Sequence, residues 1–144
     1  MRERGRASII IVAGLVSAIA VVILFFASRE SPTSVAAQFM QALVKADAAK
    51  LAELSYMPPD KPEVIRQKWE ATLKNSQYYK FYWEILGRED VTDTKSNILM
   101  DVVRNIALKE SYPEPFRLEL VKVDGKWLVE VRKISRAMYP FLPR

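Results

Sequence analysis

Side chains capable of acid–base or nucleophilic chemistry are few in this sequence, which contains no histidine and no cysteine. A catalyst built from such a chain would have to use carboxylates and phenols placed in perturbing surroundings. The candidates are Glu84, Asp101, Tyr79 and Tyr82. Their spacing does not mark a site, and both carboxylates have the polar parity of a strand, where exposed charges belong. We therefore predict no catalytic residue, no metal site and no cofactor.

Aromatic residues form one cluster with a second interpretation. Five of the six residues from 78 to 83 are aromatic, and tyrosine and tryptophan are enriched at protein interfaces. The simpler interpretation is a strand that buries one face and carries amphipathic aromatic side chains on the other. If the cluster binds a partner, Tyr79 and Tyr82 are the predicted contact residues.

Large apolar residues are also concentrated in the tail, residues 137–144. Met138, Tyr139, Phe141 and Leu142 stand where chain ends are usually frayed and polar. The tail either packs back on its own domain or docks on a partner, and we assign these four residues to partner binding. On that assignment, deleting the tail should release the protein from its complex and leave the domain about as stable as before.

The N-terminal region predicts a membrane anchor. Residues 7–28 carry no charge, and these 22 residues are long enough, as a helix, to cross a hydrocarbon core of about 30 Å. We expect a leader at 1–7, a transmembrane helix at 8–28 and a linker at 29–34. The alternative is a cleaved signal peptide, but Phe25 and Phe26 crowd the exit near Ala27. Retention of the anchor is therefore the prediction.

Small residues within this apolar segment suggest a face for helix packing. Ala13 and Ser17, and likewise Gly14 and Ala18, are four residues apart, so they fall on adjacent rows of one helix face. Such residues let a second membrane helix approach closely. We expect this face to pack on a neighbouring transmembrane segment.

Charge decides the orientation and excludes one class of partner. Arg2, Arg4 and Arg6 precede the apolar segment, so the N-terminus is predicted to be cytoplasmic and the domain periplasmic or extracellular, on the inner (plasma) membrane. Residues 29–144 hold 19 basic and 16 acidic residues, interspersed along the chain. That is an ordinary solvated surface, which argues against nucleic acid as a partner and leaves weak attraction to the lipid bilayer.

Apolar spacing of three and four residues predicts three helices after the anchor. The first begins at Pro32 with Ser31 as its N-cap, the second follows Asp47, and the third covers residues 63–76. The segment 56–62 contains three prolines and is predicted to be a loop.

From Tyr78 onward the period changes to two, which predicts strands. The first should stop near Gly87, and a second should cover residues 97–109 with an irregularity at Arg104. A hairpin is expected at 115–134 around Asp124-Gly125. Its register would pair Val123 with Lys126 and form an apolar wall of Phe116, Leu118, Leu120, Trp127, Val129 and Val131.

This order of elements resembles a known superfamily. A helix, a second helix DAAKLAEL, a third helix and long strands ending in FRLELVKVDGKWLVEV are similar to NTF2-like, cystatin-like domains. The resemblance covers about residues 32–134. It implies an α+β fold at 35–136, with about three helices packed on a strongly bent antiparallel sheet that sometimes leaves a pocket between them.

The predicted function is that of a non-enzymatic accessory or assembly subunit of a larger membrane complex. The layout is also similar to scaffold subunits of bacterial type IV secretion and to Mce-associated membrane proteins. Seven residues from Ser28 to Ser34 reach only about 25 Å, so the partners should be membrane-embedded protein subunits. The alternative is an anchored ligand-binding or enzymatic NTF2-like domain. A pocket of converging polar groups would favour the alternative, and a filled interior would favour the accessory subunit.

Overall fold

The computed structural model describes residues 30–104, 106 and 110–144. Residues 31–144 form one compact unit, so the tail at 137–144 belongs to the same unit as residues 35–136. The predicted leader and transmembrane helix, with the packing residues Ala13, Gly14, Ser17 and Ala18, lie outside the described residues. In the part of the chain that the structure describes, no helix is both long and apolar enough to cross a membrane.

The domain's first two helices begin directly after the predicted capping residues, and its third begins one residue earlier than predicted. Helix α2 (Pro32–Lys45) starts after Ser31, whose hydroxyl accepts a hydrogen bond from the Ser34 amide at 3.1 Å. Helix α3 (Ala48–Leu54) starts after Asp47, whose carboxylate accepts from the Lys50 amide at 3.0 Å. Helix α4 (Pro62–Asn75) begins with a proline at its first position, which needs no donor there. All three helices are thus confirmed.

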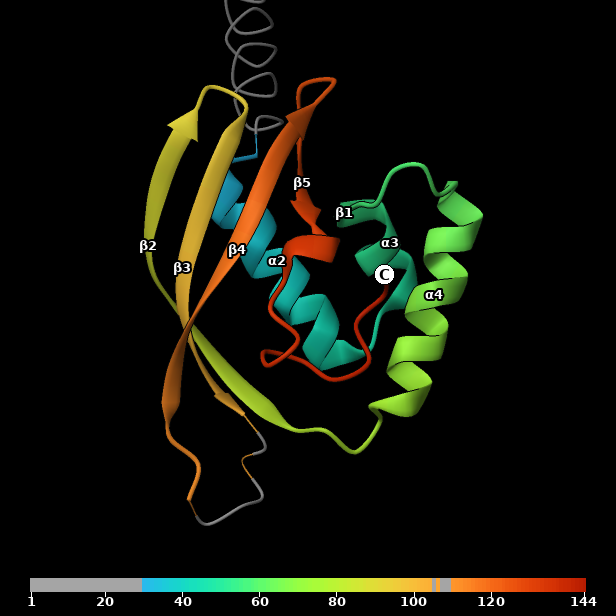
Figure 1. Ribbon diagram of the computed structural model, residues 1–144, viewed down its shortest axis with the longest axis vertical. Coiled ribbons are helices and arrows are strands. Elements are labelled where there is room, and N and C mark those ends of the chain that lie inside the picture. Colours follow the sequence, from blue (N-terminus) through green and yellow to red (C-terminus); the bar gives the residue numbers. More distant parts are fainter. Residues whose placement is uncertain (1–29, 105, 107–109) are drawn as a thin grey trace, which may run out of the picture. The chain divides into compact units, whose positions relative to one another are not determined.

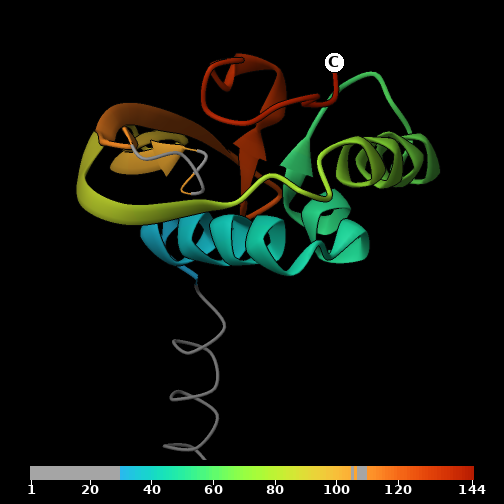
Figure 2. The same ribbon diagram turned by 90° about the horizontal axis from the view of Figure 1, so that it is seen from below.

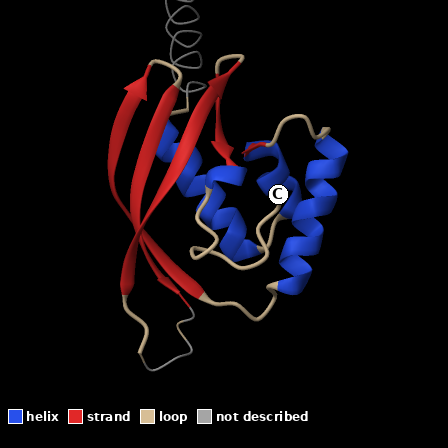
Figure 3. Ribbon diagram, in the orientation of Figure 1, coloured by secondary structure: helices blue, strands red, loops and turns tan. Residues whose placement is uncertain are grey.

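Five strands form one sheet in the order β1-β5-β4-β3-β2 (Figure 1). Strand β1 (Ser55–Tyr56) pairs in parallel with β5 (Lys126–Glu130), and the other neighbours are antiparallel. The remaining strands are β2 (Phe81–Thr92), β3 (Lys95–Arg104) and β4 (Pro113–Val123). Strand β1 was not predicted, because two residues beside three prolines carry no periodicity. Figure 3 shows the helices gathered beside the twisted strands.

The hairpin between β4 and β5 has the predicted turn and register. Asp124 and Gly125 adopt positive φ angles of 50° and 78°, and Val123 pairs with Lys126. The strand ends earlier than expected, however, because β5 stops at Glu130 and the chain turns into the short 3-10 helix η1 (Val131–Lys133). The prediction of a strand as far as residue 134 is wrong, and this turn sends the tail back over the domain.

Strand β2 is longer than the sequence pattern indicated. It continues through Gly87 to Thr92, and its pairing with β3 shifts register between Ile85 and Gly87. The shift accommodates Leu86, so the apolar parity is broken without ending the strand. Strand β3 ends at Arg104, where an irregularity was expected, and part of the predicted continuation to 109 lies outside the described residues.

The core lies between one face of the sheet and helix α2, which runs beneath the strands (Figure 2). Alternate residues Ile98, Met100 and Val102 of β3 are fully buried. The predicted apolar wall is buried at Leu118, Leu120, Val129 and Val131, whereas Phe116 and Trp127 are half-buried. Each large aliphatic side chain buried in this way contributes about 1.5–3 kcal/mol.

Candidate functional site

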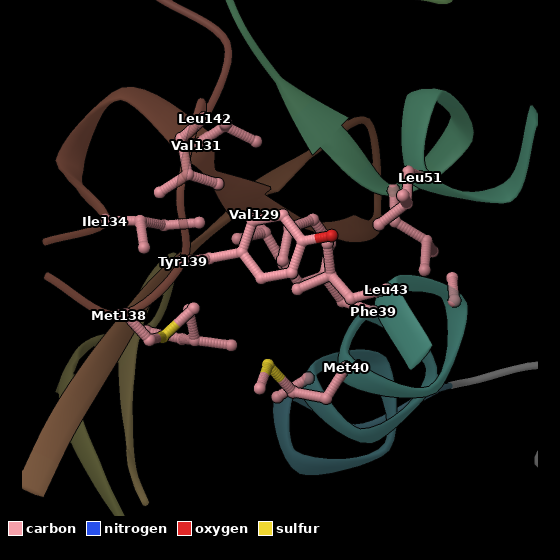
Figure 4. Packing of buried hydrophobic residues seen from close by; sticks show 14 of the residues in the cluster. Phe39, Met40, Leu43, Leu51, Val129, Val131, Ile134, Met138, Tyr139 and Leu142 are labelled. Atoms are coloured by element: carbon pink, nitrogen blue, oxygen red, sulfur yellow. The ribbon is translucent and has the colours of Figure 1, made fainter. Parts of the chain in front are cut away.

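The tail lies inside the domain's own core. Met138, Tyr139 and Leu142 are only 1, 4 and 9% exposed, so the expectation of an exposed tail is wrong for these three residues. In Figure 4, Met138 and Tyr139 point toward Phe39 and Met40 of α2. The turn at η1 directs the tail into the space between sheet and helices, where its apolar side chains are covered by other parts of the same chain. Of the four tail residues assigned to partner binding, Phe141 alone remains exposed, at 63%.

Hydrogen bonds from α4 fix the middle of the tail. The Tyr139 hydroxyl lies 2.8 Å from the Ser76 hydroxyl, which also donates to the Thr72 carbonyl at 2.8 Å. The Thr72 hydroxyl donates to the Phe141 carbonyl at 2.5 Å. Both ends of the helical turn 72–76 thus bind the tail, and the buried polar groups there are paired with one another.

Two arginines fix the ends of the tail. Arg104 donates to the Ala137 carbonyl at 2.8 Å and forms an ion pair with Glu114 at 2.6 Å. The Arg144 guanidinium donates to the carbonyls of Arg132 at 2.7 Å and Ile134 at 3.0 Å. These contacts close the tail into a loop against η1. Sequence reasoning missed the role of both arginines, since the tail groups that Arg104 binds and the groups that Arg144 binds are main-chain oxygens.

Three aromatic rings meet where the tail reaches the sheet. Tyr79 and Phe81 pack at 5.9 Å between ring centroids, and Tyr139 meets them edge-on at 5.3 and 5.6 Å. Burial raises the pKa of the Tyr79 phenol and that of the Tyr139 phenol, the latter offset in part by the hydrogen bond with Ser76. Both phenols therefore stay protonated at neutral pH. Tyr79, predicted to bind a partner, is half-buried and donates to the Met138 carbonyl at 3.3 Å.

The candidate carboxylates lie on the other side of the sheet. Glu84 of β2 stands directly opposite Asp101 of β3, on the face turned away from the buried Met100 and Val102. Tyr82 has the same parity as Glu84 and is 61% exposed, and its contact with a partner stays a prediction. The structure therefore brings Glu84, Asp101 and Tyr82 to one open surface and separates them from Tyr79. Within the described ranges, no three acidic side chains are placed to hold a metal ion.

One carboxylate has a clear structural role that the sequence did not reveal. Asp60 accepts from Lys68 at 2.6 Å and from Arg132 at 2.9 Å. The hydrogen bond from Lys68 holds the pKa of the Asp60 carboxyl below its usual range, and the Arg132 charge lowers it further. Asp60 thereby connects the loop before α4 with that helix and with η1, which marks it as a structural residue.

The described surface of the domain includes two hollows that bear on function. One, of about 500 Å³, lies between α2 and β2 and is lined mainly by side chains of that helix, with Trp83 from the strand; its lining residues are Ala37, Gln38, Gln41, Ala42, Lys45, Asp47, Lys50 and Trp83. We call it the α2–β2 groove. The other, of about 340 Å³, lies beside exposed Phe141 and is lined by Arg136, Tyr139, Phe141, Leu142 and Arg144.

Comparison with known proteins identifies the fold. No protein-family model and no curated protein sequence matches this chain. A SEC-C motif containing protein from Rhodopseudomonas palustris is 14% identical, with a TM-score of 0.52 over 69% of this chain and 75% of that one. A domain with a cystatin-like fold from Nostoc punctiforme is 11% identical, with a TM-score of 0.51 over 67% of this chain and 69% of that one.

A third solved structure agrees with these two. It is a putative calcium/calmodulin-dependent protein kinase type II association domain from Thiobacillus denitrificans, 9% identical, with a TM-score of 0.50 over 69% of this chain and 89% of that one. At such identities, the similarity concerns the fold alone. With three helices on a five-stranded sheet, residues 31–144 have the NTF2-like, cystatin-like fold that the resemblance implied.

Proposed function

We propose that this chain is a non-enzymatic accessory subunit of a membrane complex, held by an anchor at residues 8–28 and acting through protein contacts of its NTF2-like domain. One observation carries the proposal: the tail fills the space between the sheet and the helices. Met138 and Tyr139 are buried against α2, where a domain of this shape could otherwise enclose a small ligand. Because the interior is filled, the domain would bind other proteins through its outer surface.

The distribution of reactive groups supports the same proposal. The carboxylates Glu84 and Asp101 stand on the outer face of the sheet, whereas general acid–base catalysis usually uses a carboxyl group in a desolvated cleft. The buried phenol of Tyr139 is hydrogen-bonded to Ser76 and serves the core. An enzymatic role would need polar groups that converge on a shared cavity.

Exposed apolar side chains offer contact area. Tyr82, Leu86 and Phe141 are each more than half exposed, and the first two lie on β2. Tyrosine and phenylalanine gain most when an interface covers them. We expect Tyr82 to contact the partner, and we retain Phe141 as the one tail residue still suited to that role.

The test is affinity capture of the full-length chain from native membranes after detergent solubilisation. Wild-type protein should recover a membrane-embedded partner in fixed ratio. Tyr82→Ala should reduce the recovery severalfold, as expected when a central interface tyrosine is lost. Tyr112→Ala is the matched control, because this tyrosine is equally exposed, at 65% against 61%, and lies on the loop before β4. Capture of no partner by wild type, or turnover of a small molecule by the purified chain, would refute the proposal.

A further inference from the structure

The α2–β2 groove runs beneath the last strand of the sheet. Residues Phe81, Trp83 and Ile85 of β2 alternate toward the helix side, and Trp83 lines the groove opposite Ala37 and Gln41 of α2. The indole is half-buried, so part of its surface remains open to the groove. A partner side chain placed here would meet an aromatic wall on one side and a helix flank on the other.

Strand β2 also ends the sheet, so one of its edges pairs with no other strand in the described part of the chain. Proteins usually protect such edges with bulges and charges. Here the register shifts and the charged run Arg88, Glu89 and Asp90 fall in the second half of β2. The first half, with Trp83 at its centre, has a regular register with β3 and remains open to strand addition.

Charge at the groove favours an acidic occupant. Lys45 lines the groove and takes part in no ion pair within the described ranges. The Lys50 ammonium also lines it and lies 3.4 Å from Glu53. The Asp47 carboxylate, which caps α3, keeps its negative charge, so the lining carries two ammonium groups against one carboxylate. One free ammonium group and one weakly paired one would attract a carboxylate brought by a ligand.

We propose that the α2–β2 groove binds an extended acidic segment of a partner protein, which adds to the free edge of β2. Main-chain hydrogen bonds to the strand would provide affinity, and alternate side chains would provide specificity. An apolar side chain packs on Trp83, and a carboxylate approaches Lys45. Side chains of the opposite parity meet Tyr82 on the outer face. This inference rests on the proposed function and identifies the type of partner segment.

The experiment uses the full chain in detergent micelles and a displayed library of random peptides of about ten residues, the length of a long strand. Selected peptides are synthesised, and their Kd values are measured for wild type, Lys45→Glu and Lys74→Glu. Lys45 and Lys74 each lie in the last turn of a 14-residue helix, so the two charge reversals perturb their helix dipoles alike. Of these two lysines, only Lys45 lines the groove.

Selection should yield peptides enriched in acidic and apolar residues. Lys45→Glu should raise their Kd about tenfold or more, because attraction becomes repulsion, and Lys74→Glu should change it less than about twofold. Ala37→Gln, which narrows the groove with a neutral, helix-favouring side chain, should weaken binding severalfold while thermal unfolding remains cooperative. Backbone amides in β2 should exchange more slowly with solvent when a selected peptide is bound.

The proposal is overturned if no peptide is selected, if both lysine reversals have the same effect, or if exchange in β2 is unchanged. Binding of anionic phospholipid vesicles in place of peptides would also overturn it. Affinity capture separates this failure from failure of the proposed function. If wild type and Lys45→Glu recover the same partner equally, the groove assignment fails and the accessory role stands. If wild type recovers none, the accessory role itself fails.

Discussion

Met138 offers the sharpest test of whether the tail belongs to the core. Its side chain is 1% exposed and points toward Met40 of α2. Met138→Ala removes most of that side chain and leaves a cavity that the surrounding sheet and helix close only in part. For such a site the loss in free energy of unfolding is about 2–5 kcal/mol. Since a domain of this size has only about 5–15 kcal/mol of stability, the variant should be visibly weakened.

The matched control is Phe141→Ala, three residues further along the same tail. Phe141 is larger than Met138 and 63% exposed, so its truncation should change the free energy of unfolding by less than about 0.5 kcal/mol. Urea titration of the full chain in micelles, followed by tryptophan fluorescence, measures both variants because Trp69 is fully buried. Equal stability losses for the two variants would refute the burial of the tail.

Three further predictions concern local conformation and pH. Ala46 ends α2 with φ at 54°, a left-handed conformation that glycine adopts more readily than alanine, so Ala46→Gly should stabilise the protein by about 0.5–1 kcal/mol. Ala49→Gly inside α3 should destabilise it by a similar amount, and the same urea titration measures both. Ion pairs hold the pKa of folded Asp60 below its unfolded value near 3.9. These pairs therefore stabilise the folded protein at pH values above about 3.9, and their contribution is lost as the pH falls through the folded pKa. The difference in free energy of unfolding between wild type and Asp60→Asn should therefore disappear in acid. A difference that is constant with pH would contradict the ion-pair assignment. Burial raises the pKa of Tyr139, so stability should fall as pH rises above about 10, and Tyr139→Phe should flatten that fall in unfolding curves recorded at several pH values.

The sequence predicted the elements whose signals are local. Ser31 and Asp47 as caps, and Asp124-Gly125 as a turn, depend on residues within a few positions of one another, and all three were confirmed. The paired register of the hairpin followed from the turn. Such features need no knowledge of how distant segments meet.

The features that were missed depend on distant partners. The tail is apolar in either interpretation, and the residues that cover and bind Tyr139, among them Phe81 and Ser76, lie about 60 residues earlier in the chain. The length of β2 was hidden by a register shift that breaks its parity at Leu86. The α2–β2 groove exists because β2 is the last strand in the sheet. The periodicity of a single segment does not reveal the order of the strands.

The parallel pairing of β1 with β5 has a consequence for the order of folding. Ser55 meets Val129, 74 residues later, so the pair can form only after the helices and the antiparallel strands have brought both ends together. The Ser55 hydroxyl also accepts from the Trp69 indole at 2.8 Å and donates to the Leu51 carbonyl at 2.6 Å. The pairing of β1 with β5 should therefore form after the rate-limiting barrier, whereas the hydrogen bonds of the Ser55 hydroxyl join residues at most 14 positions apart and can form earlier.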